Sequence, residues 1–318
     1  MTRPAIVASA PARVDLAGGW TDVAPYTTEQ GGAVCNVAIE MRATATVTTR
    51  PAGGATAPDE PLVRAAWERA GCPDVGISLR SDIPVGSGLG GSSSAGVALA
   101  AALAAWRHAT LSLHELAELS RRTETETLGV PGGCQDHFAA AFGGALLLTC
   151  GATTDVETLP LGETAIAAFE ARALVAFTGE SRMSARTISA VLDAYRAGEE
   201  RTCASLAAMK RLAPLLADAL RRGDIDRLGV LLADQWTAQR ALHDTITTPR
   251  IDRIVSAVAE AGALGTKALG ASGGGCVLVI ARADRVDAVR DALAAQATLL
   301  PVRVARTGVT IHTPEVQS

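Results

Sequence analysis

The stretch Pro84–Ser94 (PVGSGLGGSSS) combines residue types that could hold a phosphate group. Closely spaced glycines let successive backbone N–H groups point inward around an anion. The serines stand at the start of an apolar helix, where free N–H groups and the helix dipole favour negative charge, and a serine hydroxyl there can ligate Mg²⁺. The sequence therefore predicts a phosphate-binding loop. Its candidate residues are Pro84, Gly86, Ser87, Gly88, Leu89, Gly90, Gly91, Ser92, Ser93 and Ser94.

Other patterns compete for this loop. Gly86, Gly88 and Gly91 satisfy the G-x-G-x-x-G dinucleotide fingerprint, but the preceding segment Gly76–Ser81 is amphipathic, whereas a buried parallel strand is uniformly apolar. A Walker A loop is excluded because no lysine follows the glycines. A flexible turn with a serine N-cap is the structural alternative, but a cap requires far fewer special residues.

The segments around the loop indicate strands early in the chain and helices later. Alternating or β-branched residues predict strands at Ala5–Leu16, Gly32–Val47 and Gly76–Ser81. An apolar helix is expected at Ser94–His108, directly after the glycines. From Ser184 to Glu260 the pattern is mostly helical.

Later segments complete this pattern. Ser112–Thr125 is expected to form a helix, with Ser112 as its cap and Glu115 three residues on. Cys276–Ala281 is a continuous apolar strand, and Val302–Val304 is expected to be the final strand. The fold class expected is α+β with two lobes, residues 1–170 and 171–318.

Composition narrows the class of protein. The chain has 318 residues, of which 48% are hydrophobic, enough for two domains with cores. The net charge of -4 and a pI of about 5.8 argue against nucleic acid as a partner. The six cysteines form no C-x-x-C pair, which favours free thiols in a reducing compartment. Since no apolar run is long enough to span a bilayer, we expect a cytoplasmic protein without a membrane partner.

Three segments, in order along the chain, resemble the motifs of the GHMP small-molecule kinases. They are Ala10–Asp22 (APARVDLAGGWTD), Pro84–Ser94 and Gly270–Cys276 (GASGGGC). The resemblance covers essentially the whole chain and implies a two-lobed GHMP kinase fold with the active site in the inter-domain cleft. It also implies ATP and Mg²⁺ as cofactors and a sugar or sugar phosphate as the phosphoryl acceptor. The protein is expected to be a monomer or a homodimer.

Two segments resemble different sugar-kinase branches of this family. Gly132–Gly144 (GGCQDHFAAAFGG) fits the D-glycero-D-manno-heptose 7-phosphate kinases best, whereas Trp20, in the segment GGWTD, fits the fucokinases. Both branches phosphorylate an anomeric hydroxyl. The resemblance therefore implies a sugar 1-kinase, with heptose 7-phosphate favoured over fucose or another unphosphorylated sugar.

Two other functions compete with phosphoryl transfer to a sugar. A nucleotide-binding pseudokinase that acts as a sensor would be expected to lack Asp136, Arg13 or the serines, and all are present. ATP-dependent decarboxylation, known in a relative of mevalonate kinase, is disfavoured by Asp22 and by the pair Gln135-Asp136, which suit a sugar hydroxyl.

Asp136 and Arg13 are the candidate catalytic residues. Asp136 matches the family's aspartate, which accepts or orients the proton of the acceptor hydroxyl. Arg13 matches a basic residue near it in the galactokinase-like branch, where a cation keeps the aspartate ionised and stabilises the transferred phosphoryl group. From the residues alone, Asp136 also suits the N-cap of a turn at His137–Phe142, and Arg13 suits a solvated strand.

Asp22 matches the family's acceptor for sugar hydroxyls, since a carboxylate can accept two hydrogen bonds from a vicinal diol. An Asx-turn after a double glycine is the local alternative. The segment Gly179–Arg186 resembles a substrate-side loop in which Arg182 or Arg186 could bind a phosphate already on the substrate, or simply begin a helix. The candidate substrate-binding residues are Gly19, Trp20, Asp22, Tyr26, Gly132, Gly133, Gln135, Arg182, Gly273 and Gly274.

Ser92 and Glu124 are the candidate Mg²⁺ ligands. Magnesium takes few protein ligands and keeps waters and phosphate oxygens in its shell. The family usually shows Glu-Arg at the second position, whereas this chain has Glu124-Thr125-Glu126. The choice between Glu124 and Glu126 therefore stays open, and at least one of them is expected to be a solvated helix carboxylate.

Overall fold

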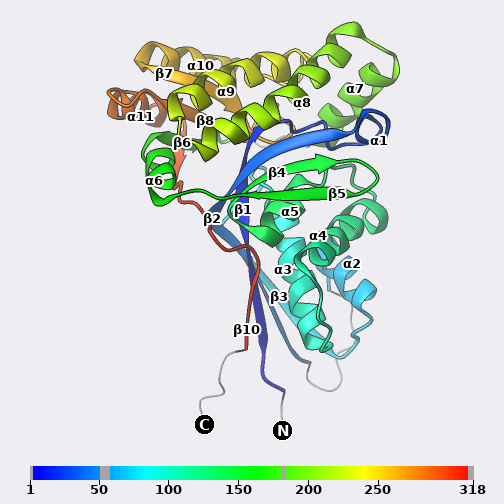
Figure 1. Ribbon diagram of the computed structural model, residues 1–318. Helices are drawn as coiled ribbons and strands as arrows, with labels where there is room; N and C mark the ends of the chain where they lie inside the picture. Colours follow the sequence, from blue (N-terminus) through cyan, green and yellow to red (C-terminus); the bar gives the residue numbers. More distant parts are fainter. Residues whose placement is uncertain (1–2, 51–57, 181–183, 314–318) are drawn as a thin grey trace.

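The computed structural model describes residues 3–50, 58–180 and 184–313, which form two antiparallel sheets with helices packed on them (Figure 1). The α+β class with two lobes is therefore confirmed. In the first sheet the strands lie in the order β10 (Thr310–His312), β1 (Ile6–Ala17), β2 (Gly32–Thr49), β4 (Ala145–Cys150) and β5 (Thr154–Leu159), and β3 (Val75–Ser81) also pairs with β2. In the second sheet the order is β7 (Ala263–Ala268), β8 (Cys276–Ala281), β6 (Ala173–Phe177) and β9 (Thr298–Leu300).

The helices divide between the two sheets. Those of the first lobe are α1 (Tyr26–Gln30), α2 (Pro61–Ala70), α3 (Gly91–Trp106), α4 (Leu113–Arg122), a π-helical turn at Thr123–Thr127, and α5 (Gln135–Phe142). Those that follow are α6 (Glu163–Arg172), α7 (Ser184–Arg196), α8 (Glu200–Arg221), α9 (Ile225–Arg240), α10 (Pro249–Ala261) and α11 (Val286–Ala294). None of the helices in the described part of the chain is long and apolar enough to cross a membrane.

The second half of β1 is buried on both faces. Its first residues alternate between buried and half-buried, but every residue from Ala10 to Ala17 is buried. The reason is that α3 and α5 pack on one face of the first sheet and α8 packs on the other (Figure 1). Any polar side chain on this half of β1 must therefore find its partner inside the protein. The pairing of β1 with β2 shifts register between Asp15 and Ala17, a kind of irregularity that re-aims side chains.

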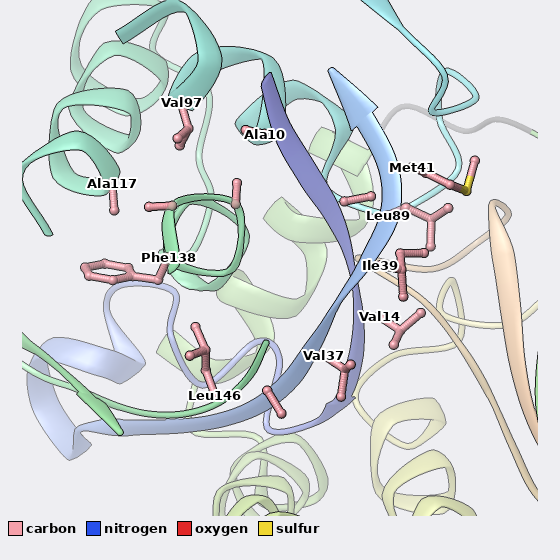
Figure 2. Close-up of a cluster of buried hydrophobic side chains, with 14 of the residues drawn as sticks. Ala10, Val14, Val37, Ile39, Met41, Leu89, Val97, Ala117, Phe138 and Leu146 are labelled. Atoms are coloured by element: carbon pink, nitrogen blue, oxygen red, sulfur yellow. The ribbon is translucent and has the colours of Figure 1, made fainter. Parts of the chain in front are cut away.

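The helices of the first lobe are held by apolar packing and a strong cap. Figure 2 shows Phe138 of α5 between Ala117 of α4 and Leu146 of β4, and all three side chains are fully buried. The predicted cap of α4 is confirmed, because Glu115 N–H donates to Ser112 Oγ at 3.2 Å and the Glu115 carboxylate accepts from Ser112 N–H at 2.7 Å. This capping box fixes the start of the helix that leads to the π-helical turn.

The structure differs from the sequence prediction near the chain's end. The expected final strand Val302–Val304 is wrong: the strand lies at Thr298–Leu300, and Val304 forms only an isolated bridge with Ile39. Pro301 follows β9 directly and has no N–H for a ladder, which explains the early end of the strand. The short, half-exposed strand β10 has too little apolar alternation to be recognised from sequence.

The end of the chain returns from the second lobe to the first. After β9, the segment passes α6, where Val304 N–H donates to Glu170 Oε1 at 2.7 Å and Arg306 pairs with Glu163. It then adds β10 to the edge of β1. We propose the division into lobes at residues 1–170 and 171–318, with β10 as an extension of the first sheet.

The glycine loop that precedes α3 packs directly against the loop between β7 and β8. Gly88 and Gly270 both have positive φ, and a Cβ atom on Gly270 would lie 2.9 Å from Gly88 Cα. Cys276 N–H donates to Ser87 O at 2.7 Å across the same contact. The second sheet therefore supports the loop through backbone atoms, at a distance that side chains would prevent.

We predict that Gly270→Ala destabilises the protein by at least about 2 kcal/mol, since left-handed backbone costs about 1 kcal/mol and overpacking adds about 1–3 kcal/mol. Gly71→Ala is the matched control, because Gly71 also has positive φ but nothing lies within 4 Å of its Cβ position. Urea unfolding of both variants checks this prediction. Equal losses of stability would show that the backbone contact is unimportant.

Candidate active site

A cleft of about 650 Å³ opens where the two lobes meet. The end of β1, the glycine loop and the start of α5 line most of it, and Ile188, Gly270 and Ala271 line it from the second lobe. The cleft thus lies where the sequence placed the active site, and the N-terminal and central motifs converge on it although they are far apart in sequence. Its apolar end is formed by Leu62, Leu79 and Ile83 together with Val85, whose side chain is 90% exposed.

The glycine loop forms the centre of the cleft wall. Gly90, in left-handed conformation, is the N-cap of α3, so the first N–H groups of this buried helix face the cleft without helical partners. Eight of the ten predicted phosphate-loop residues line the cleft: Pro84, Gly86, Ser87, Gly88, Gly90, Gly91, Ser92 and Ser93.

Two predicted residues of the loop have other positions. The Leu89 side chain is fully buried in the core of the first lobe. The Ser94 hydroxyl is buried and donates to Pro11 O at 2.8 Å and Gly90 O at 2.9 Å. Both side chains therefore hold the loop and α3 in place, and neither lines the cleft.

Asp136 lies at the start of α5, where Arg13 of β1 pairs with it. Arg13 Nε donates to Asp136 Oδ1 at 2.7 Å, Arg13 Nη2 lies 2.6 Å from the same oxygen, and Arg13 Nη1 donates to Gly88 O at 2.6 Å. The Arg13 side chain is 3% exposed and that of Asp136 is 26% exposed. The guanidinium thus ties the carboxylate to the glycine loop through Oδ1, and Asp136 lines the cleft with no hydrogen bond to its second oxygen, Oδ2, among the described residues.

Asp22 lies deeper in the cleft, beside the same end of α5. Its Oδ2 accepts the backbone N–H of Gln135 at 3.0 Å, and a Cβ atom on Gly133 would lie 2.0 Å from this oxygen. Burial raises the pKa of Asp22 to about 6, partly opposed by the N–H of Gln135, and the nearby charges of Asp136 and Asp15 raise it further. The carboxyl is therefore poised between its two protonation states near neutral pH.

Glu124 lies in the π-helical turn and faces the start of α3. Ser92 Oγ donates to Glu124 Oε1 at 2.6 Å, and Ser93 Oγ donates to Oε2 at 3.2 Å. His137 Nε2 lies 3.1 Å from the same Oε2. Burial is the largest single influence and would raise the pKa of Glu124, but hydrogen bonds from His137, Ser92 and Ser93 together hold that pKa below its ordinary value. The result is an ionised carboxylate beside two hydroxyls.

The two candidate glutamates separate clearly in space. Glu126 points away from the cleft and pairs with Arg69 at 2.9 Å and with Arg122 at 3.0 Å. Glu124 lines the cleft next to Ser92. Hard oxygen donors of this kind suit Mg²⁺, which needs only one or two protein ligands. Glu124 is therefore the carboxylate whose position fits a metal ligand.

Sequence reasoning missed two features of this wall. His137, to which it assigned no chemistry, bridges Glu124 and Ser120, whose Oγ lies 2.9 Å from His137 Nδ1. The apolar end near Leu62 was not anticipated either, because α2 carries no motif. The only hint in the sequence at the contact between His137 and Glu124 was the position of this histidine directly after Asp136.

The floor of the cleft contains a buried ion pair that joins the lobes. Lys267 Nζ of β7 donates to Asp15 Oδ2 at 2.7 Å and to the backbone oxygen of Asp15 at 3.0 Å. The two side chains are 0% and 3% exposed. Burial lowers the pKa of Lys267, and the Asp15 carboxylate opposes this effect.

The remaining predicted residues fall into three groups. Gly19, Trp20, Gly132, Gly133 and Gln135 line the cleft. Tyr26 does not, because it packs edge to face on Tyr195, with ring centroids 5.4 Å apart, and Gly273 and Gly274 are also outside the lining. Arg182 lies outside the described residues.

Two family models match the chain. The model described as the GHMP kinases N terminal domain matches residues 61–144, and the model for the GHMP kinases C terminal matches residues 216–298. The first range contains the glycine loop, Glu124 and Asp136, and the second contains Lys267. Both matches thus cover segments that build the cleft.

Known proteins similar to this chain include sugar kinases. It is 28% identical over 294 residues to the D-glycero-alpha-D-manno-heptose 7-phosphate kinase of Campylobacter jejuni, covering 83% of this chain and 86% of that protein. It is 25% identical over 311 residues to the bifunctional fucokinase/GDP-fucose pyrophosphorylase of Arabidopsis thaliana, covering 86% of this chain and 29% of that longer protein.

A solved structure shares the fold over the whole chain. The D-glycero-D-manno-heptose 1-phosphate kinase of Bacteroides thetaiotaomicron matches with a TM-score of 0.79 at 22% identity, covering 98% of this chain and 100% of that one. The two-lobed fold, the family matches and the relatives agree with the motifs seen in the sequence. The chain therefore belongs to the GHMP kinases, which transfer a phosphoryl group from ATP to a hydroxyl group.

Proposed function

We propose that the protein transfers the γ-phosphoryl group of ATP to the anomeric hydroxyl of D-glycero-D-manno-heptose 7-phosphate, giving the 1,7-bisphosphate. The observation that carries this proposal is the position of Asp136. Its carboxylate lies between the glycine loop, which would hold the triphosphate, and the pocket of Asp22, Trp20 and Gln135, which would hold the sugar. The substrate is inferred from the segment Gly132–Gly144 and from the heptose kinase relative.

In the proposed mechanism, the chain mainly positions groups and places charge. The backbone N–H groups of the glycine loop and the start of α3 bind the phosphates. Asp136 Oδ2 accepts the hydrogen bond of the attacking hydroxyl and takes or holds its proton as the new O–P bond forms. Arg13 pairs with the Asp136 carboxylate and adds positive charge near the transferred group. Asp22 and Gln135 orient the sugar.

The residues at the start of α3 fit a magnesium ion. Glu124 is ionised and Ser92 Oγ lies 2.6 Å from it, so we propose that both oxygens face the metal. When bound, Mg²⁺ would neutralise charge on the β- and γ-phosphates. His137 holds Glu124 from the opposite side and sets the direction of its carboxylate.

A specific observation favours a second acceptor, an unphosphorylated sugar such as fucose. Trp20 stands in the segment that resembles the fucokinases, and its side chain lines the cleft. In the described part of the cleft lining, Arg13 is the single arginine or lysine, and it is already paired with Asp136. A phosphate on the distal end of the sugar would therefore rely on residues outside that lining.

Asp136→Asn is expected to lower kcat by about 10²- to 10⁴-fold on the preferred sugar, with little change in the KM for ATP, because the asparagine cannot take the proton. The test is ATP consumption with heptose 7-phosphate, fucose and other sugars, with NMR of the product to locate the phosphate. Asp82→Asn, an exposed change beside the glycine loop, should match wild type.

Three outcomes of this assay would contradict the proposal. Equal turnover by wild type and Asp136→Asn would remove Asp136 from catalysis. A strong preference for fucose would replace the heptose assignment. Phosphate on a carbon other than the anomeric one would overturn the 1-kinase assignment.

Glu124→Gln should raise the Mg²⁺ concentration needed for half-maximal activity by about 10- to 100-fold, since the metal site loses its carboxylate. Glu126→Gln is the control, because Glu126 is held by Arg69 and Arg122 outside the cleft. Magnesium titrations of both variants at saturating ATP check the assignment. A larger effect in Glu126→Gln would reverse it.

Asp22→Asn should stabilise the protein at pH 7 but weaken sugar binding. A carboxyl whose pKa rises from 3.8 to about 6 on folding binds its proton more tightly when folded, so its ionisation removes stability as pH rises through that window. Above pH 6 the loss reaches roughly 3 kcal/mol, and asparagine escapes it. Urea unfolding at several pH values should show a difference between the two proteins that grows from pH 4 to pH 6. A constant difference would contradict the raised pKa.

A further inference from the structure

The two carboxylate oxygens of Asp15, at the floor of the cleft, differ in their hydrogen bonding. Oδ2 accepts the ammonium of Lys267 at 2.7 Å, whereas Oδ1 has no hydrogen-bond partner among the described residues although it is buried. The residue is 2% exposed and lines the cleft. A buried carboxylate oxygen without a donor is costly, which indicates that a ligand supplies the donor.

Polar atoms of Gln135 and Trp20 belong to the same part of the cleft as Asp15. A Cβ atom on Gly19 would lie 2.4 Å from Asp15 Oδ2 and 2.8 Å from Gln135 Nε2, so these two side chains converge where glycine leaves room. Gln135 Oε1 and the indole N–H of Trp20 are also buried without partners in the described part of the chain, and both residues line the cleft. Three buried polar atoms without partners therefore belong to residues that line one cleft.

We propose that Asp15 is a specificity-determining residue that accepts a hydrogen bond from a hydroxyl of the acceptor sugar through Oδ1, with Lys267 as the positioning residue for its other oxygen. This inference rests on the proposed sugar kinase function and deepens it. An ionised carboxylate only accepts hydrogen bonds, so the part of the substrate beside it must donate. The chemical class selected here is an unmodified hydroxyl group of a polyol.

The charges around Asp15 exclude other groups at this position. Asp136 and Asp15 are each paired with a cation, but Asp22 is not, so a phosphate or carboxylate of the substrate placed beside Asp15 would meet the Asp22 carboxyl without a compensating charge. A second phosphate on the substrate, if present, lies away from this floor. A hydroxyl-bearing part of the sugar therefore lies beside Asp15, and any charged part of the substrate lies elsewhere in the cleft.

Lys267 connects the proposed hydroxyl-binding residue Asp15 to the second lobe. It reaches Asp15 from β7 in the second lobe, across 252 positions of sequence, and also donates to the Asp15 backbone oxygen. The register of β1 shifts between Asp15 and Ala17, an irregularity that re-aims side chains at this end of the strand. The ammonium therefore sets the direction of Oδ1.

The test combines Asp15→Asn with substrates that lack single hydroxyls. For wild type, deoxygenating the contacted position of the preferred sugar should lower kcat/KM by about 10- to 100-fold, since a charge-assisted hydrogen bond is lost. In Asp15→Asn the same deletion should cost less than about threefold, whereas deletions at other positions keep their wild-type cost. The KM for ATP should stay unchanged.

Lys267→Gln provides the positioning readout. It should raise the KM for the sugar several-fold while kcat changes less, because Oδ1 is misdirected but the reacting groups are intact. If Asp15→Asn does not fold, the double variant Asp15→Asn/Lys267→Gln removes both buried charges and is used instead. Asp82→Asn, at an exposed position, is the control for effects of expression and purification.

The outcomes separate this inference from the proposed function. If wild type phosphorylates a sugar but every deoxygenation costs the same in wild type and in Asp15→Asn, Asp15 selects no hydroxyl and the inference fails alone. If wild type phosphorylates no sugar, the proposed function fails, and the inference with it. A loss confined to stability, with unchanged selectivity among the deoxy sugars, would reduce Asp15 to a structural role.

Discussion

Backbone contact between Gly88 and Gly270 is the constraint on which the rest of the structure depends. Only residues without a Cβ let the two chains approach so closely, and the hydrogen bond from Cys276 N–H to Ser87 O fixes their register. The glycine loop is therefore held between a helix of its own lobe and a strand of the other. The backbone contact, together with the side chains of Arg13, Leu89 and Ser94, keeps the free N–H groups in one direction, which is the arrangement a preorganised anion site requires.

Three aspartate carboxyl groups line this cleft, and each has a different partner that offsets the cost of its burial. Asp136 is paired with a guanidinium, and Asp15 is paired with an ammonium. Asp22 has a backbone N–H instead of a cation, and accordingly its pKa is raised to about 6. One small volume thus holds acids of unlike character, which allows a proton acceptor and hydroxyl-binding groups to stand side by side.

The sequence predicted the parts of the site that are local. The glycine loop, the cap at Ser112 and the position of Asp136 beside glycines follow from residue types within a few positions of one another. The pair of Asp15 with Lys267 could not be predicted, because it depends on how two sheets meet. Glu124 and Glu126 were equivalent in sequence, and only the π-helical turn directs the first of them to Ser92.

The return of the chain to β10 has a mechanical consequence. The polypeptide crosses between the lobes once after α6 and once before β10, and Glu170 and Val304 bond the two crossings to each other. Two covalent connections, joined to each other by a hydrogen bond, therefore link the lobes along one edge. This double connection fixes one edge of the two lobes, while the contact between Gly88 and Gly270 and the pair of Asp15 with Lys267 fix them to each other at the cleft.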